Sequence, residues 1–325
     1  MINKTIRLYE DRDKITLTTY IYEPSLEMIG AVKRPAVLIC PGGAYFNCSD
    51  AEGEPVALTF ASMGYQAFVL KYSTYGADAF VRGLKNLERR PQTEHPAPVR
   101  DIAKAMLMIK DHADEWNVDP DRIAICGFSA GAHNCAMYSV YWDKPLITEF
   151  FGREAKDFRP AAAVLCYPLT DYVFMKENMK AGSDPMNSAF FAASNLAFTG
   201  AEMPDDAKLL EISPARLVSD STPPMFIWST SEDQMVPVTH SLLMAGALSG
   251  AHIPYELHIF ERGQHGLSTA NQAAAAAMDQ INPDAAKWVP LADAWLRKRF
   301  SIQLPPTMSF DDVDASLAAS IGLEK

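Results

Sequence analysis

One short segment, CGFSAGAH at residues 126–133, contains a serine that could act as a nucleophile. Gly127, Ser129 and Gly131 fit the pattern G-x-S-x-G, which places a reactive serine on a strained turn between a strand and a helix. Small residues are needed on both sides of such a turn, because neighbouring backbone passes close to it. An apolar run at 122–126 comes before the serine, and a helical stretch follows it. The alternative is that Ser129 only begins that helix.

A serine hydroxyl becomes a good nucleophile only when a base removes its proton, and a carboxylate must orient that base. His265 stands on a glycine-flanked loop, GQHG, after a predicted strand at 254–260. Asp233 follows the preceding predicted strand, 225–229. Both loops come where strands end, as does the turn at Ser129, and open parallel sheets bind ligands at that edge. We therefore predict that Ser129, His265 and Asp233 are the nucleophile, the base and the orienting acid.

Each of these residues also has a purely structural interpretation. Asp233 could cap the helix that follows it, and His265 could be an ordinary loop histidine. Two other acids, Glu232 and Asp171, are alternatives to Asp233, which is favoured because it lies one strand before the histidine. His133 lies one helical turn beyond the predicted nucleophile, so we expect it to be packed and hydrogen-bonded rather than beside the hydroxyl.

Hydrolysis at a serine also needs N–H donors for the negative charge that develops on the carbonyl oxygen of the substrate. The sequence PGGA directly follows a predicted strand, which is the position of a glycine-rich oxyanion loop. We predict that the backbone N–H groups of Gly43, Ala44 and Ala130 form the oxyanion hole, with Gly42 shaping the turn. The alternative is a plain β-turn. Just beyond it, residues 49–52 resemble a capping box, which we interpret as structural.

These residues require a sheet whose strands end at one edge. Apolar runs alternate with helical stretches through most of the chain, which indicates an α/β fold, a mostly parallel sheet with helices on both faces. An alternating pattern at residues 14–22, with a short partner at 5–9, predicts an antiparallel hairpin before it. The predicted strands are 35–40, 66–71, 122–126, 161–166, 225–229 and 254–260, and the predicted helices are 54–63, 98–116, 130–141, 237–250 and 284–299.

Length and composition favour one catalytic domain. With 325 residues, 48% of them hydrophobic, the chain can bury one large core, which we assign to residues 1–300. The connection at about 168–224 is too long for a simple crossover and is rich in aromatic and methionine residues. It predicts a lid-like insertion that lines a pocket or, alternatively, a separate packing cluster. Residues 301–325 are expected to be a tail that docks on the body or on a second subunit, as in a homodimer.

The charge and the cysteines exclude several classes of protein. A formal net charge of -11 and a pI near 5.1 offer no basic surface to nucleic acid or anionic lipid. No apolar stretch is long enough for a membrane span, and the charged N-terminus does not resemble a signal peptide, so we expect a soluble, cytoplasmic protein. The five cysteines, without CxxC or histidine-rich spacing, are expected to be reduced and mostly buried, and no metal site is expected.

Four motifs in order, PGGAY, DPDRIAICGFSAGAH, SEDQMVP and GQHG, resemble the bacterial acetylesterases of the α/β-hydrolase superfamily, a group that includes xylan-esterase-like and xylanase-B-like sugar hydrolases. The similarity extends over about residues 15–300, and Ser129, Asp233 and His265 follow the order of that fold. It implies a serine esterase without a cofactor that acts on short acyl esters, including acetyl groups on sugars or oligosaccharides. The related oxyanion loop reads HGGG where this chain has PGGA, so the second oxyanion donor stays open.

The leading hypothesis is hydrolysis of a small ester, in which Ser129 attacks the acyl carbon and His265 carries the proton. One alternative is cleavage of a peptide or a lactone by the same fold. Against these, the sequence contains no propeller domain of the oligopeptidase kind, and a serine replaces the cysteine of dienelactone hydrolases. The other alternative is a binding protein of this fold that has lost its chemistry. Such proteins usually lack one of the three residues, whereas all three are present here.

Overall fold

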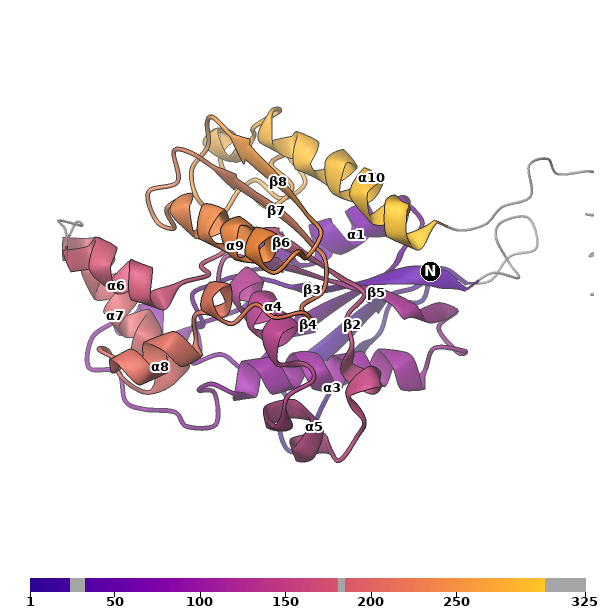
Figure 1. Cartoon of the computed structure of the whole chain (residues 1–325), viewed down its shortest axis with the longest axis horizontal. Coiled ribbons are helices and arrows are strands. Elements are labelled where there is room, and N and C mark those ends of the chain that lie inside the picture. Colours follow the sequence, from indigo (N-terminus) through magenta and orange to yellow (C-terminus); the bar gives the residue numbers. More distant parts are fainter. Residues whose placement is uncertain (24–32, 181–184, 302–325) are drawn as a thin grey trace, which may run out of the picture.

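Eight strands form one sheet in the computed structural model, which describes residues 1–23, 33–180 and 185–301 (Figure 1). Their order across the sheet is β1-β2-β4-β3-β5-β6-β7-β8. The pairs β1–β2 and β2–β4 are antiparallel, and all the others are parallel, so the predicted hairpin and mostly parallel sheet are confirmed. The strands are β1 (Thr5–Arg7), β2 (Thr16–Tyr20), β3 (Arg34–Cys40), β4 (Gln66–Lys71), β5 (Val118–Phe128), β6 (Ala162–Cys166), β7 (Met225–Thr230) and β8 (Tyr255–Phe260).

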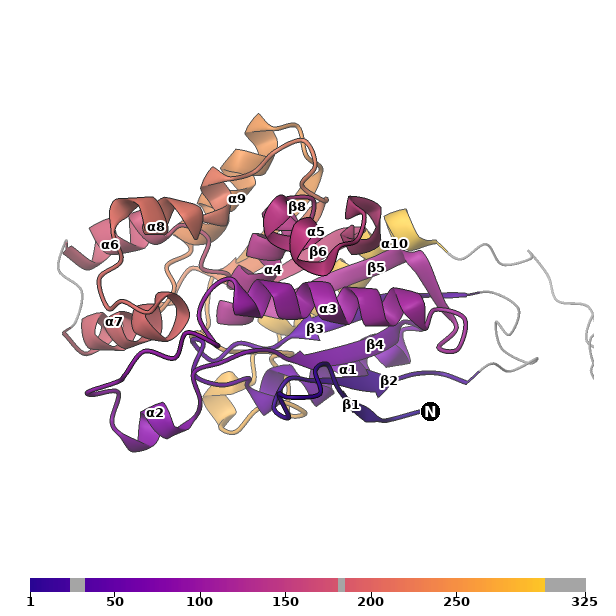
Figure 2. The ribbon, with the colours of Figure 1, turned by 90° about the horizontal axis from the view of Figure 1, so that it is seen from below.

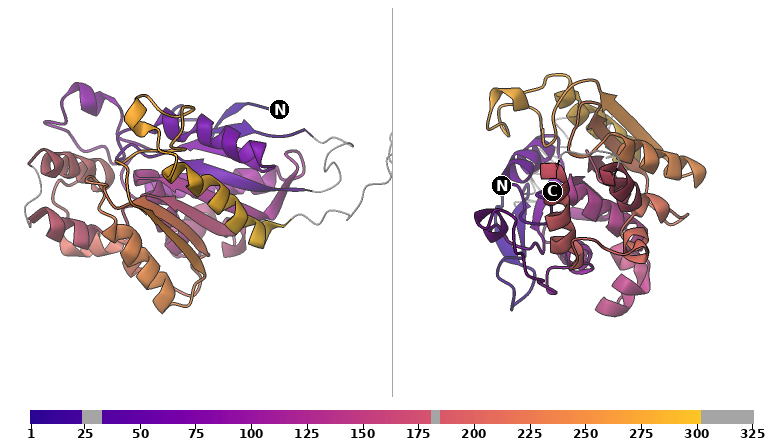
Figure 3. Two further views of the ribbon diagram at one scale, coloured as in Figure 1. Left: turned by 90° about the horizontal axis from the view of Figure 1, so that it is seen from above. Right: turned by 90° about the vertical axis from the view of Figure 1, so that its left-hand side faces the viewer.

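Helices cover both faces of the sheet (Figures 1 and 3). In β3, Leu38 packs into the core beneath one set of helices and Val37 into the core beneath the other. A strand that is buried on both faces needs apolar side chains at every position, which explains why this run does not alternate. One face carries α1 (Glu54–Ser62) and α10 (Trp288–Phe300), and the other carries α3 (Ala97–Asp111), α4 (Ala130–Tyr141) and α9 (Thr239–Gly250).

Several element ends differ from those expected. The helix predicted at 98–116 is α3 and ends at Asp111, because the chain then turns so that the N–H of Val118 reaches the carbonyl of Ala113. β5 begins at that turn, four residues before the predicted strand. The last helix begins only at Trp288, after a short 3-10 turn. These ends are fixed by contacts between elements, which local patterns do not contain.

The connection between β6 and β7 extends past the carboxyl ends of the parallel strands, where its described residues form helices that lie together (Figures 1 and 2). The predicted tail, from residue 302 on, lies outside the described residues. None of the described helices has the length and apolarity needed to cross a bilayer. The remaining helices are α2 (Asp78–Val81), α5 (Pro145–Phe151), α6 (Tyr172–Lys180), α7 (Pro185–Thr199) and α8 (Asp206–Glu211), with 3-10 turns η1 (Asp50–Glu52), η2 (Ala155–Phe158), η3 (Pro214–Arg216), η4 (Met278–Gln280) and η5 (Ala285–Lys287).

Candidate active site

Ser129 stands on the sharp turn between β5 and α4. Its backbone has φ 51° and ψ -119°, a conformation that is costly for a residue with a side chain. A Cβ on Gly127 would lie 2.3 Å from the carbonyl oxygen of Gly131, and a Cβ on Gly131 would lie 2.0 Å from the carbonyl oxygen of Cys40. Both glycines are therefore required by close backbone approach, as the G-x-S-x-G pattern predicts. The turn lifts the hydroxyl above the carboxyl edge of the sheet.

The three residues predicted to form a triad lie in hydrogen-bond contact. His265 Nε2 lies 2.8 Å from Ser129 Oγ, and His265 Nδ1 lies 2.6 Å from Asp233 Oδ2. The other oxygen of Asp233 accepts the backbone N–H groups of Met235 and Val236, each at 2.9 Å. Because a carboxylate accepts the Nδ1 proton, Nε2 is left free to accept the proton of the serine hydroxyl. The arrangement can therefore move a proton from the serine to the imidazole.

The two alternative acids lie elsewhere. Glu232 is exposed, and its carboxylate accepts the backbone N–H of Gly263 at 3.1 Å. Asp171 is buried, pairs with Arg216 at 2.8 Å and accepts a backbone N–H in the first turn of α6. Of the three candidate acids, Asp233 is the one that contacts the imidazole.

His133 is packed below the site, as expected. It is fully buried, its Nε2 donates to the carbonyl of Ile212 at 2.9 Å, and its Nδ1 accepts the hydroxyl proton of Tyr45 at 2.6 Å. Burial lowers the pKa of His133 to about 3, so the ring stays neutral. Its role in this geometry is to hold Tyr45, which belongs to the loop after β3.

The loop after β3 bends tightly beside Ser129. Gly43 has φ 131°, and a Cβ there would lie 2.3 Å from the carbonyl oxygen of Asn47, so the glycine is required. Ala44 follows with φ 51°. Ala44 and Ala130 both line a small pocket at Ser129, which we call the serine pocket. The loop thus has the conformation and the place of a predicted oxyanion loop, and the donor roles of Gly43, Ala44 and Ala130 stay a prediction.

The serine pocket has a free volume of about 30 Å³. A cavity needs roughly 10–15 Å³ of such space to hold one water molecule, so the serine pocket has room for a small acyl group and not for a long chain. Its walls include Tyr172 from α6 and Phe190 and Phe191 from α7. Side chains of the connection between β6 and β7 therefore line this pocket beside Ser129.

Glu52 is a site residue for which the sequence pattern predicts a different role. The capping-box interpretation of residues 49–52 is wrong, because in the described structure Ser49 makes no capping hydrogen bond through its side chain. Glu52 is buried instead, and its carboxylate accepts the N–H of Gly42 at 2.7 Å and the hydroxyl of Tyr167 at 2.6 Å. Burial raises the pKa of the Glu52 carboxyl, and these two hydrogen bonds oppose the rise. Glu52 thereby fixes the glycine loop at Gly42.

Tyr167, the residue directly after β6, connects the same network to the imidazole. Its hydroxyl accepts the N–H of Ser268 at 3.0 Å, and its ring meets the ring of His265 edge to face with centroids 5.0 Å apart. The signal that could have found it is positional, because Tyr167 follows β6 as Ser129 follows β5. For Glu52 the signal is a carboxylate ten residues after Gly42, which gains meaning only when the loop is folded back.

We expect Glu52→Gln to lower kcat for ester hydrolysis by about 10- to 100-fold with little change in KM, because small misplacements of catalytic groups cost that much. A glutamine offers one acceptor oxygen, so either the Gly42 N–H or the Tyr167 O–H loses its acceptor. The free energy of unfolding should fall by about 1–3 kcal/mol. Steady-state kinetics and urea unfolding measure the two effects.

The matched control is Asp50→Asn, which changes an exposed carboxylate of the same 3-10 turn that pairs with Lys71. We expect this control to keep kcat within about twofold, as for exposed ion pairs generally. Equal kcat values for the two variants, both folded, would contradict the positioning role of Glu52.

Comparisons with known proteins agree with this fold. A family model described as BD-FAE matches residues 21–248. Endo-1,4-beta-xylanase B of Butyrivibrio fibrisolvens is 33% identical over 74% of this chain and 33% of its own length, and the acetylxylan esterase of Xylanibacter ruminicola is 26% identical over 78% and 45%. The chain thus spans less than half the length of these relatives. The structure of an acetyl ester-xyloside bifunctional hydrolase from Caldicellulosiruptor lactoaceticus matches with a TM-score of 0.68 and 29% identity, over 91% of this chain and 96% of that chain. The predicted α/β-hydrolase fold is therefore confirmed.

Proposed function

Since the chain belongs to the BD-FAE family of α/β-hydrolase-fold proteins, we propose that it is a carboxylesterase that hydrolyses short acyl esters, in particular acetyl esters of sugars or oligosaccharides. The observation that carries the proposal is the contact of Ser129 Oγ with His265 Nε2 at 2.8 Å, with Asp233 behind the imidazole. Relatives named as acetylxylan esterase and acetyl ester-xyloside hydrolase support the choice of ester.

In the proposed mechanism, Ser129 attacks the acyl carbon while His265 takes the hydroxyl proton at Nε2. The tetrahedral oxyanion faces the N–H groups of the loop after β3 and of Ala130. The imidazolium, stabilised by Asp233, then gives its proton to the leaving alcohol, and an acyl-enzyme forms on the serine. Water, activated by the same imidazole, releases the acid and restores the enzyme. The net reaction consumes one ester and one water molecule and yields one acid and one alcohol.

A substrate panel tests the reaction class. We expect the protein to release acetate from p-nitrophenyl acetate and from acetylated xylo-oligosaccharides, with kcat/KM on these esters well above that on a matched peptide amide or a lactone. Acetate release, followed by chromatography, is the measurement for the natural sugar esters. A protein that cleaved only the amide or the lactone, or none of the compounds, would overturn the proposed function.

A further inference from the structure

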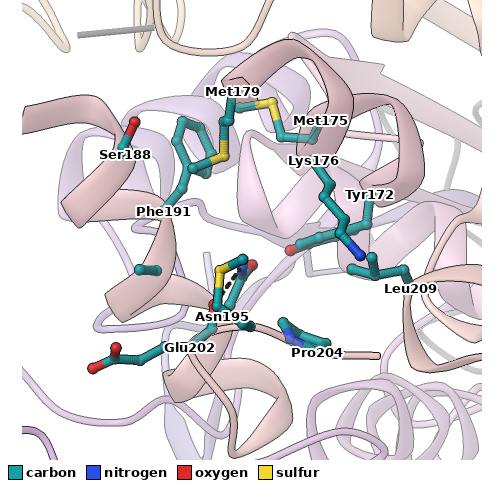
Figure 4. Close-up of a pocket in the computed structure, with 12 residues that line it drawn as sticks. Tyr172, Met175, Lys176, Met179, Ser188, Phe191, Asn195, Glu202, Pro204 and Leu209 are labelled. Carbon is teal, nitrogen blue, oxygen red and sulfur yellow. Dashed lines mark hydrogen bonds between the residues drawn. The ribbon is translucent and has the colours of Figure 1, made fainter. Parts of the chain in front are cut away.

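A second, larger pocket lies within the insertion, next to the serine pocket. It has a free volume of about 240 Å³ and is lined mostly by apolar side chains, including Met175 and Met179 of α6 and Leu209 of α8, with Lys176 and Glu202 among the polar ones (Figure 4). Tyr172 and Phe191 line both this insertion pocket and the serine pocket. These two side chains are therefore the partition between a small space at the nucleophile and a large apolar space behind it.

The serine pocket is placed to receive the acyl part of an ester. Ala44 and Ala130, whose N–H groups are the predicted oxyanion donors, line it beside Ser129. The leaving alcohol must take its proton from His265 Nε2, so it departs on the imidazole side. The acyl chain, on the other side of the carbonyl carbon, then enters the serine pocket, whose walls include Tyr172 and Phe191.

The two halves of the partition are held differently. Tyr172 packs edge to face on the buried His133 ring, with centroids 5.0 Å apart, and its backbone N–H donates to Ser213 Oγ at 2.8 Å. Phe191 has ring contact with its neighbour Phe190, at a centroid distance of 5.9 Å, and is 7% exposed. Tyr172 is thus tied to the body of the protein, whereas Phe191 stands between the two spaces on α7.

We propose that Phe191, together with Tyr172, sets the upper limit of acyl chain length because the two side chains separate the serine pocket from the insertion pocket. The inference rests on the proposed ester hydrolysis and adds which side chain makes it selective for short acyl groups. With the phenyl ring removed, the two spaces become continuous, and a chain of six to eight carbons can extend between Met175 and Leu209. Each methylene buried there is worth up to about fourfold in kcat/KM.

The test compares p-nitrophenyl acetate, butyrate and octanoate. For the wild type, kcat/KM should fall steeply from acetate to octanoate. In Phe191→Ala, the octanoate-to-acetate ratio of kcat/KM should rise at least tenfold, and Phe191→Leu should give a smaller rise. Because the readout is a ratio within one variant, partial loss of folded protein does not change it. Thermal unfolding by circular dichroism shows that each variant is folded.

The matched control is Phe150→Ala, which removes the same atoms at an exposed position on α5. Phe150 is not among the described residues that line either the serine pocket or the insertion pocket, so this variant leaves the partition and the acyl site in place. Its octanoate-to-acetate ratio should stay within about threefold of the wild type. In a Phe191→Ala background, Ala192→Phe fills the insertion pocket from α7 and should return the ratio toward the wild-type value.

Two results would overturn the proposal. One is an unchanged octanoate-to-acetate ratio in both folded Phe191 variants, and the other is an equal rise of that ratio in Phe150→Ala. Each of these presupposes that the wild type hydrolyses acetate. A wild type that hydrolysed none of the three esters would instead contradict the proposed function, so the two failures are distinguishable.

Discussion

Ser129→Ala should abolish ester hydrolysis, with a fall in kcat of about 10⁶-fold, as when a triad serine is removed elsewhere. The alanine keeps the backbone conformation of the turn but removes the oxygen that contacts His265 Nε2 at 2.8 Å. KM should change little, because the hydroxyl adds little to the binding of the ground state. The measurement is steady-state turnover of p-nitrophenyl acetate with a preparation large enough to detect residual rates.

A covalent probe separates the nucleophile from a merely nearby serine. Phenylmethanesulfonyl fluoride should add one sulfonyl group to the wild type, on the peptide that contains Ser129, and none to Ser129→Ala. Ser62→Ala, at an exposed serine whose hydroxyl bonds only to its own helix in the described structure, is the matched control and should react and turn over as the wild type does. Loss of only a few fold in Ser129→Ala, or labelling elsewhere, would reject Ser129 as nucleophile.

The arrangement of Ser129, Asp233 and His265 could be predicted because each residue follows a strand whose apolar sequence is readable on its own. Parallel strands end at one edge, so residues that follow different strands meet there, although Ser129 lies more than 100 positions before Asp233 and His265 in the chain. The turn at Ser129 was predictable from a local pattern, since Gly127 and Gly131 stand where backbone segments approach closely. Local patterns and one rule of topology therefore suffice for this contact.

Glu52 and the partition at Phe191 could not be predicted in this way. A carboxylate after a serine reads as a capping box, and only the fold shows that the loop returns Gly42 to its oxygen at 2.7 Å. Phe191 lies in a stretch whose aromatic residues equally suit a packing cluster or a pocket, and the described insertion contains both kinds of contact. Selectivity and positioning depend on which side chains face one another across elements, and no periodicity contains that information.

Asp233→Asn should have the second largest effect on ester hydrolysis, with a fall in kcat of about 10⁴-fold. Asp233 accepts the Nδ1 proton at 2.6 Å, which leaves Nε2 free to act as the base. An asparagine has one acceptor oxygen, and the backbone N–H groups of Met235 and Val236 already bond to one side of the acid, so the amide NH₂ faces the imidazole. Nδ1 then becomes the acceptor, Nε2 carries the proton, and the serine hydroxyl loses its base.

Glu232→Gln is the control that decides between the neighbouring acids. Its carboxylate bonds to the N–H of Gly263, and the amide oxygen of glutamine can keep that bond, so we expect kcat within a few fold of the wild type. The informative quantity is the ratio of kcat between Glu232→Gln and Asp233→Asn, since both substitutions replace a carboxylate by an amide in one loop. A loss in Glu232→Gln as large as in Asp233→Asn would mean that the loop shifts in solution and that either acid can orient His265. A loss confined to Asp233→Asn would place the orienting charge on one side chain, where the two backbone N–H groups hold it against the imidazole.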